Sequence, residues 1–351
     1  MTPVETIVAI AVPLEAEHVE RIRAVDPSVT VLYEPGLLPP ERYPADHGGD
    51  PGFRRTAAQE ERYWEILNQA QVLYGFPNEN PAGLARIAAS NPRLQWIHAM
   101  TAGAGGTVKA SGLDTESLSK LKITSSAGVH ALPLAEFAAL GILNGFKRSA
   151  ELAQDQAAKL WPEVRTPTRL VNGSRLVITG LGEIGLETAR IARALGMTVS
   201  GTKRTVEPLA GIEEVTDNEG LAGLLAGADA VVNTLPGTPY TEKLFNRAIF
   251  AAMNPGTVFV NVGRGTVVDE AALLEALDNG QVSYACLDVF AVEPLPQASP
   301  LWNHPRVMVS PHTSALSAAE NRLIAERFCS NLRTFLDGGE LPHLVDPVHF
   351  Y

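Results

Sequence analysis

Short apolar runs alternate with amphipathic stretches through the first third of the chain. The runs are rich in β-branched residues and predict strands at 7–12, 29–33, 71–74, 94–98 and 121–124. The amphipathic stretches predict helices at 14–25, 57–70 and 82–89. Residues 34–55 are rich in proline, glycine and charge, which predicts an exposed loop. This alternation is typical of a small α/β domain.

The alternation becomes more regular from residue 174 onward. Apolar runs predict six strands, at 175–179, 197–200, 230–235, 257–262, 283–289 and 306–310. Helical patterns separate most of them, at 185–195, 221–226, 247–252 and 270–278. Six strands with helical crossovers predict a mainly parallel, doubly wound sheet.

Two amphipathic segments connect these regions. Residues 131–159 predict one long helix or two in sequence, leading from the first domain into the second. Residues 315–336 predict a helix that crosses back to the first domain and ends at Gly338-Gly339. Its apolar positions include Leu316, Ile324, Phe328 and Leu332.

The composition narrows the classes of partner. A formal net charge of −11 argues against nucleic acid or an anionic membrane as the main partner. The apolar N-terminal run lacks a basic leader and predicts a buried strand, while the run at 131–146 is too short to span a bilayer. Cys286 and Cys329 lie far apart in apolar surroundings, so we expect both to be small core residues of a protein in a reducing cytoplasm. No Cys or His cluster has the spacing of zinc ligands.

A glycine pattern lies between one of the predicted strands and the helix after it. In such a turn the first glycine permits tight bending, the second allows close approach of a pyrophosphate, and the third allows helix and strand to pack closely. The start of the helix also offers N–H groups and the positive end of its dipole. The pattern therefore predicts a dinucleotide site formed by Gly180, Leu181, Gly182, Glu183, Ile184 and Gly185.

The end of the next predicted strand carries no acidic residue. The strand runs into Thr202-Lys203-Arg204, and the nearest acid, Glu207, lies further along. A carboxylate there would bind the ribose hydroxyls of NAD and repel the additional phosphate of NADP, which lysine and arginine neutralise. We therefore expect Thr202, Lys203 and Arg204 to favour NADP(H), with NAD(H) as the alternative cofactor. The structural alternative is that Lys203 and Arg204 are solvated surface charges.

Three further segments each follow the end of a predicted parallel strand: Gly263-Arg264-Gly265, residues 288–294 and Pro311-His312. The carboxyl ends of the strands line one crevice in a doubly wound sheet, so these residues converge there. They offer a cation, two carboxylates and an imidazole, which suits an anionic carbonyl substrate. Taken singly, each has a structural alternative as a turn, loop or strand-end residue.

With these motifs the chain resembles the D-isomer-specific 2-hydroxyacid dehydrogenases, and within them the NADPH-dependent 2-oxo-acid reductases. The matching stretches follow the family's order and spacing: 180–185, 233–241, 261–265, 287–294 and 310–312. The resemblance covers residues 121–315 well and the N-terminal domain loosely. It implies a doubly wound Rossmann cofactor domain, 126–313, inserted in a smaller flavodoxin-like α/β substrate domain, 1–125 and 314–351.

The resemblance implies an enzyme that interconverts 2-oxo acids and D-2-hydroxy acids. It also implies that the catalytic residues are Arg264, Glu293 and His312. His312 can supply the proton because imidazole titrates near neutral pH. Glu293 would orient the ring and favour its protonated form, and Arg264 would clamp the substrate carboxylate and polarise the carbonyl. Asp288 matches the position that holds the nicotinamide carboxamide. The other implied cofactor contacts are Leu235, Pro236, Thr241, Val262, Gly263 and His312.

In this family the other domain offers backbone N–H groups to the substrate carboxylate. The corresponding stretch is rich in glycine, which allows close backbone approach, and predicts a loop formed by Thr101, Ala102, Gly103, Ala104 and Gly105. The alternative is a flexible interdomain loop. Phe76 and Trp96 either shape the substrate pocket or are core aromatics, and His98 and His130 are expected to be structural or surface residues.

The resemblance suggests a homodimer, with residues 131–159 and Trp161 at its interface, acting on glyoxylate, hydroxypyruvate or a bulkier 2-oxo acid. Formate and phosphite dehydrogenases share the scaffold, but nothing in the sequence selects their substrates. A phosphoglycerate dehydrogenase with a regulatory tail is disfavoured, because the chain ends soon after the return helix. A different class, a dinucleotide-sensing corepressor or scaffold on the same fold, is disfavoured by the complete set of Arg264, Glu293 and His312.

Overall fold

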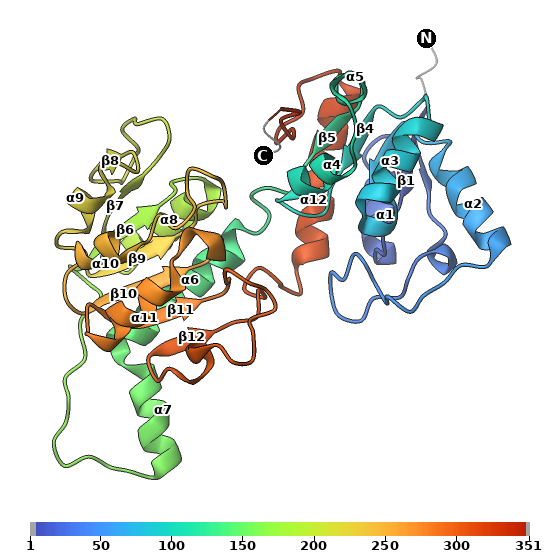
Figure 1. Cartoon of the computed structure of the whole chain (residues 1–351). Helices are drawn as coiled ribbons and strands as arrows, with labels where there is room; N and C mark the ends of the chain where they lie inside the picture. Colours follow the sequence, from blue (N-terminus) through green and yellow to red (C-terminus); the bar gives the residue numbers. More distant parts are fainter. Residues whose placement is uncertain (1–4, 349–351) are drawn as a thin grey trace. The chain divides into compact units, whose positions relative to one another are not determined.

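The computed structural model describes residues 5–348, which form two compact units (Figure 1). Unit 1 comprises the described residues of Met1–His130 and Leu316–Tyr351, and unit 2 is Ala131–Ala315. Each unit is built around a parallel sheet flanked by helices, so the predicted α/β fold class is confirmed. No helix within residues 5–348 is long and apolar enough to cross a membrane.

The described part of unit 1 contains a five-stranded parallel sheet with the order β2-β1-β3-β4-β5. The strands are β1 (Thr6–Ile10), β2 (Val29–Leu32), β3 (Val72–Tyr74), β4 (Trp96–His98) and β5 (Lys122–Thr124). The α-helices are α1 (Ala16–Arg23), α2 (Ala57–Leu67), α3 (Pro81–Ser90), α4 (Ala104–Ala110), α5 (Thr115–Lys120) and α12 (Glu320–Leu336). Two short 3₁₀ helices are η1 (Pro35–Leu37) and η2 (Pro77–Glu79).

Helices cover both faces of this sheet, which explains why its strands are apolar along their length. Ala9 and Leu73 belong to a core with α2, α3 and α4, whereas their neighbours Val8 and Val72 face α1 and α12. The return helix α12 contributes Ile324, Phe328 and Leu332 to that second core, as its apolar positions predicted. Phe76 and Trp96 are both core aromatics of this unit.

Three predictions for unit 1 need correction. The return helix begins at Glu320 and not at 315, because the carbonyl and hydroxyl of Ser317 accept hydrogen bonds from Glu320 and Ala319 and form a turn there. Leu316 is consequently outside the helix and 44% exposed. The loop predicted at 34–55 is not simply exposed, since Leu37 and Leu38 enter the core. Helices α4 and α5 were missed because their sequences are rich in small and polar residues.

The seven-stranded parallel sheet in the described part of unit 2 has the order β12-β11-β10-β9-β6-β7-β8. Its strands are β6 (Arg175–Thr179), β7 (Thr198–Thr202), β8 (Val215–Thr216), β9 (Ala230–Asn233), β10 (Thr257–Asn261), β11 (Val282–Leu287) and β12 (Val307–Val309). Its α-helices are α6 (Ala131–Lys147), α7 (Ser149–Ala158), α8 (Glu183–Ala194), α9 (Leu221–Leu225), α10 (Arg247–Ala251) and α11 (Glu270–Asp278). Its 3₁₀ helices are η3 (Gly265–Val267) and η4 (Pro300–Asn303).

All six predicted strands of unit 2 are present, and a seventh, β8, was missed because two residues show no alternation. The segment 131–159 forms two helices, separated at Arg148, whose φ of 56° ends the first. Helices α9, α10 and α11 cover one face of the sheet, and α6 and α8 cover the other. The strand order reverses between β6 and β9, and ligands bind outside the carboxyl ends of strands at such a switch point.

Candidate active site

The glycine-rich turn between β6 and α8 has the shape that a pyrophosphate needs. Gly180 adopts a φ of +94°, and a Cβ at Gly185 would lie 2.2 Å from the carbonyl oxygen of Gly180. At Gly182, in contrast, no heavy atom of the described chain lies within 4 Å of an added Cβ. The N-cap residue of α8 is Gly182, which makes no side-chain hydrogen bond to the start of the helix. The open side of the turn at Gly182 and the start of the helix that follows it therefore fit the phosphates of a dinucleotide.

The three residues predicted to select the cofactor lie at the end of β7 and differ in their surroundings. Thr202 is buried, and its hydroxyl and carbonyl oxygens accept hydrogen bonds from the N–H groups of Gly180 (3.2 Å) and Leu181 (2.8 Å). Thr202 thus supports the glycine turn. Lys203 is partly exposed and forms an ion pair with Glu207, and Arg204 is exposed. Lys203 and Arg204 thus directly follow the strand whose last residue supports the glycine turn, and Glu207 is the ion-pair partner of Lys203.

A ladder of buried polar side chains joins the carboxyl ends of β6, β9 and β10. The Thr179 hydroxyl donates to Asn233 Oδ1 (2.9 Å), and Asn233 Nδ2 donates to Asn261 Oδ1 (2.8 Å). Asn261 Nδ2 in turn donates to the carbonyl oxygen of Arg264 (3.2 Å). The ladder links the cofactor turn to the segment that carries Arg264. The sequence motifs included both asparagines but gave no sign of this role.

Two glycines place Arg264 at this edge. A Cβ at Gly263 would lie 2.6 Å from the Leu235 carbonyl oxygen, and one at Gly265 would lie 1.8 Å from the Phe290 carbonyl carbon. The segment after β10 therefore packs directly on the loops after β9 and β11, which no larger residue would permit. Arg264 is exposed between them, and its guanidinium donates to the Gly263 carbonyl oxygen (2.8 Å).

His312 and Glu293 form a close pair. Nδ1 of His312 lies 2.7 Å from Oε2 of Glu293, and the two side chains are 47% and 34% exposed. Partial burial raises the pKa of Glu293, but hydrogen bonds from His312 and the Phe290 N–H, with the positive charges of His312 and Arg264, outweigh burial and lower it. Because Glu293 is then ionised, Nδ1 carries the proton it shares with the carboxylate. Nε2 is left to exchange a proton with a substrate.

The remaining predicted cofactor residues occupy loops at the same edge. The Thr241 hydroxyl donates to the Pro236 carbonyl oxygen (2.6 Å) and accepts from the Thr238 N–H (2.9 Å), so it closes the loop after β9. Leu235 is partly buried and Val262 is buried in the core. Asp288, at the end of β11, is buried and holds the turn that carries His312.

The predicted substrate loop of unit 1 follows β4. Thr101, Ala102 and Gly103 are exposed, whereas Ala104 and Gly105 are buried in the first turn of α4. The loop thus offers exposed backbone at its first three residues and helix N–H groups at its last two.

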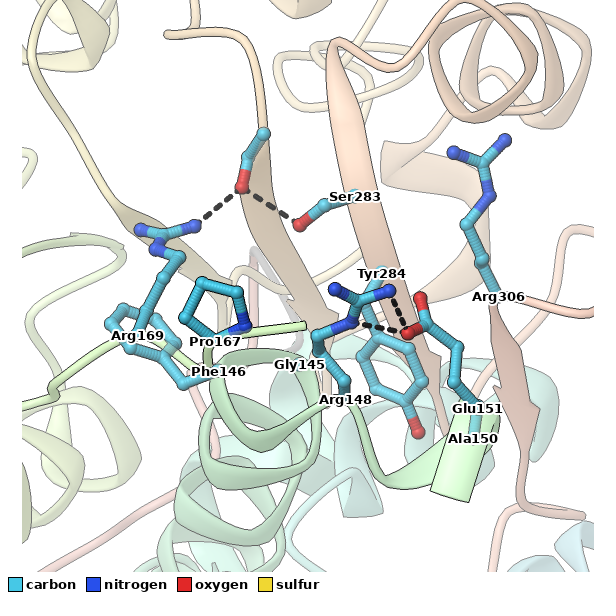
Figure 2. Close-up of a pocket in the computed structure, with 11 residues that line it drawn as sticks. Gly145, Phe146, Arg148, Ala150, Glu151, Pro167, Arg169, Ser283, Tyr284 and Arg306 are labelled. Atoms are coloured by element: carbon cyan, nitrogen blue, oxygen red, sulfur yellow. Dashed lines mark hydrogen bonds and ion pairs between the residues drawn. The ribbon is translucent and has the colours of Figure 1, made fainter. Parts of the chain in front are cut away.

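The opposite edge of the unit 2 sheet contains a cavity of about 300 Å³ (Figure 2). Its cations are already engaged. Arg169 lies against the Phe146 ring (4.3 Å to the centroid) and forms an ion pair with Asp229 (2.8 Å), and Arg148 pairs with Glu151. The residues that line this cavity therefore include neither an exposed cation nor an imidazole–carboxylate pair of the kind found at the carboxyl edge. No group of three His, Cys, Asp or Glu side chains within residues 5–348 could hold a metal ion.

The carboxyl edge of unit 2 thus brings together a dinucleotide turn, a cation and a carboxylate–imidazole pair, which defines a nicotinamide-dependent oxidoreductase. Comparison with known proteins supports this class. The family model described as "D-isomer specific 2-hydroxyacid dehydrogenase, NAD binding domain" matches residues 139–314. Glyoxylate/hydroxypyruvate reductase A of Serratia proteamaculans is 30% identical over 288 residues, covering 79% of this chain and 90% of its own.

Two solved structures share the fold over nearly all of both chains. A D-isomer specific 2-hydroxyacid dehydrogenase from Xanthobacter autotrophicus Py2, in complex with NADPH and MES, superimposes with a TM-score of 0.75 at 28% identity, covering 99% of this chain and 100% of the other. An NADPH-dependent glyoxylate/hydroxypyruvate reductase from Sinorhizobium meliloti, in complex with NADP and sulfate, gives 0.71 at 25% identity, with 99% and 100% covered. The chain belongs to the D-isomer specific 2-hydroxyacid dehydrogenase family. It is accordingly an NAD(P)-dependent oxidoreductase of small 2-oxo and 2-hydroxy acids.

Proposed function

We propose that this protein uses NADPH to reduce small 2-oxo acids, with glyoxylate and hydroxypyruvate as its substrates. The observation that carries the proposal is the His312–Glu293 pair, 2.7 Å apart, at the same sheet edge as Arg264 and the glycine turn. Relatives and structural neighbours named as glyoxylate/hydroxypyruvate reductases support this choice of substrates.

The chemistry follows from what each side chain can do. The bound dinucleotide supplies the hydride. His312 donates a proton from Nε2 to the carbonyl oxygen, while Glu293 holds the ring through Nδ1 and stabilises its protonated form. The exposed guanidinium of Arg264 binds the substrate carboxylate and polarises the adjacent carbonyl. In this proposal residues 126–313 bind the dinucleotide, and the loop at Thr101–Gly105 binds the substrate carboxylate through its N–H groups.

The substrate is tested by following NADPH oxidation with a panel of 2-oxo acids. We expect turnover with glyoxylate and hydroxypyruvate, and slower turnover with bulkier acids. Tight NADPH binding without turnover across the panel would instead favour a dinucleotide-sensing protein on the same fold.

The preference for NADP(H) rests on Lys203 and Arg204 at the end of β7, where NAD-binding chains place an acid. The measurement is the ratio of kcat/KM for NADPH to that for NADH, which we expect to exceed one clearly. Glu207 competes with the phosphate for Lys203, so Glu207→Gln should raise the ratio and Lys203→Ala should lower it. A preference of the wild type for NADH would refute this part of the proposal.

We also propose a homodimer that works in the cytoplasm. The arm, residues 149–170, leaves the sheet of unit 2 (Figure 1) and exposes large apolar side chains, including Trp161 (84%) and Val164 (86%). A second copy of the chain would cover them, because patches of this kind mark protein interfaces. Cys286 and Cys329 are unpaired and buried, which suits a reducing compartment.

Sedimentation equilibrium tests the dimer. The wild type should sediment as a dimer, and a Trp161→Ser/Val164→Ser variant should shift to monomer. Tyr240→Ser, which removes another exposed aromatic of unit 2, is the matched control and should leave the dimer intact. A monomeric wild type at all concentrations would contradict the dimer.

A further inference from the structure

We propose that His130 and Glu320 are positioning residues, which clamp together the two chain connections of unit 1 and so hold the predicted substrate loop in place. The inference rests on the proposed function, in which groups of both units act on one substrate. The chain leaves unit 1 after His130 and returns to it at Leu316. His130 is thus the last residue before the first connection, and Glu320 begins α12 shortly after the second.

The side chains of this pair are buried and face each other. Nε2 of His130 lies 3.0 Å from Oε1 of Glu320, and the two side chains are 14% and 7% exposed. Oε2 of Glu320 has no hydrogen-bond partner within residues 5–348. Because a buried carboxylate without a partner is unfavourable, the structure in which the imidazole reaches Glu320 is favoured over others. We call this pair the clamp.

A second contact joins the same two parts of the chain. The outgoing segment, residues 125–130, leads to the first connection. The guanidinium of Arg327 donates to the carbonyl oxygen of Ala127 in this segment (3.0 Å). Arg327 and Glu320 are about two helical turns apart, so they lie on one face of α12. The helix therefore holds the outgoing segment at two points.

The outgoing segment is in turn bonded to the substrate loop. Ser126 is fully buried, and its N–H donates to the carbonyl oxygen of Thr101 (3.2 Å). Its hydroxyl donates to the carbonyl oxygen of Ala99 (2.9 Å), two residues earlier. Thr101 is the first residue of the loop predicted to bind the substrate carboxylate. A displacement of the outgoing segment would therefore displace this loop as well.

The first turn of α12 is itself anchored in unit 1. Asn321 is 3% exposed, and its Oδ1 accepts from Nε2 of His47 (2.9 Å). Its Nδ2 donates to the carboxylates of Glu15 (3.0 Å) and Glu41 (3.3 Å). Glu15 is the N-cap residue of α1, and His47 and Glu41 belong to the loop before α2. The clamp thus fastens the outgoing segment to a helix start that is already fixed.

Removing the carboxylate of the clamp should affect the substrate and spare the cofactor. In Glu320→Ala we expect kcat/KM for hydroxypyruvate to fall about 10- to 10²-fold, with KM raised and kcat lowered together. The Kd for NADPH should change less than about twofold, because the glycine turn lies in unit 2. Glu326→Ala is the matched control. It removes a carboxylate of the same helix that pairs with Arg322 at the surface (3.0 Å), and should leave kcat/KM within about twofold of wild type.

Variants of His130 test whether the two side chains act as a pair. His130→Ala leaves the carboxylate of Glu320 buried without a partner, so its loss of kcat/KM should be at least as large as that of Glu320→Ala. His130→Gln retains an N–H donor and should recover kcat/KM to within about fivefold of wild type. The double variant His130→Ala/Glu320→Ala should lose no more than His130→Ala alone, because no unpartnered carboxylate remains.

Hydrogen exchange provides a measurement that does not depend on activity. Glu320→Ala should speed amide exchange in residues 99–105 and in the outgoing segment by at least about threefold, and Glu326→Ala should not. Melting temperatures show whether each variant is folded, and His130→Ala replaces Glu320→Ala if that variant does not fold.

Two results would overturn the inference. One is normal kcat/KM and normal exchange in a folded variant that lacks the clamp. The other is a loss of NADPH binding as large as the loss of kcat/KM. A wild type without turnover on any 2-oxo acid would instead refute the proposed function, and the exchange measurement would still test the clamp.

Discussion

Two histidines lie at the carboxyl ends of parallel strands, one in each unit, and they differ in burial and in the groups that their ring nitrogens face. His98 ends β4 of unit 1 and is fully buried. Its ring nitrogens face hydroxyls, Thr124 Oγ1 at 2.8 Å from Nδ1 and Ser126 Oγ at 3.2 Å from Nε2. His312 follows β12 of unit 2, is 47% exposed, and faces the carboxylate of Glu293.

The comparison shows that position at a sheet edge does not make an imidazole an acid. Burial lowers the pKa of His98 to about 3, so this ring is neutral at any working pH and can only accept or donate fixed hydrogen bonds. His312 has an ionised partner at Nδ1 and solvent access, so its Nε2 is open to a substrate. A carboxylate partner and an open face are therefore the features that distinguish the candidate catalytic histidine.

The largest expected effect separates the two rings directly. His312→Ala should lower kcat for hydroxypyruvate by about 10²- to 10⁴-fold, the contribution of a general acid, while NADPH still binds. His98→Gln should leave kcat within about twofold of wild type, because the buried ring cannot reach a substrate. Steady-state kinetics with NADPH titrations measures both. Comparable losses of kcat in the two variants would show that a carboxylate partner and solvent access do not distinguish the catalytic histidine.

The carboxylate partner gives the next largest effect. Glu293→Gln keeps the shape of the side chain but removes the charge that orients and stabilises the protonated ring, so kcat should fall about 10²-fold. The Kd for NADPH should be unchanged. The ion pair contributes to stability only while Glu293 is ionised. Because its pKa is lowered in the folded protein, that contribution is present above the carboxyl's unfolded pKa and is lost as the pH falls through the folded value. Unchanged kcat in Glu293→Gln would show that His312 needs solvent access but no ionised partner to supply the proton.

The smallest effect concerns stability and belongs to His98. Its pKa is near 6.5 in the unfolded chain and about 3 in the folded one, so below pH 6.5 only the unfolded chain takes up the proton. Stability from this group is therefore lost as the pH falls below 6.5, by up to about 1.4 kcal/mol per pH unit. Urea unfolding on both sides of pH 6.5 should show a steeper acid loss in wild type than in His98→Gln. Equal slopes would mean that the ring is protonated in the folded state.

Most of the strands and helices of unit 2 could be predicted from the sequence, whereas the finer structure of both units could not. The strand–turn–helix at Gly180 was predicted because glycine spacing and β-branched residues act locally. The beginning of α12 was not, because a turn at Ser317 competes with the helix. The ladder of Thr179, Asn233 and Asn261 could not be predicted, since its members lie on three strands whose register the sequence does not give.

The same limit applies to the candidate site. Arg264, Glu293 and His312 were found because each follows a strand at one edge of a parallel sheet. That Asp288 binds the turn around His312 depends on the pairing of β11 with β12, which brings Leu287 opposite Val309. The polar run Ser310, Thr313 and Ser314 was the available signal, but serine and threonine at a strand end are common enough to carry no such meaning alone.

His312 is the residue that we propose supplies the proton when the carboxyl edge of unit 2 reduces a 2-oxo acid. The most direct measurement is to incubate the purified protein with NADPH and hydroxypyruvate, identify the product with its configuration, and repeat this with His312→Ala. We expect the wild type to oxidise NADPH and form D-glycerate, and His312→Ala to bind NADPH but form product at least about 10²-fold more slowly. No product from the wild type, or undiminished product from His312→Ala, would contradict this proposal.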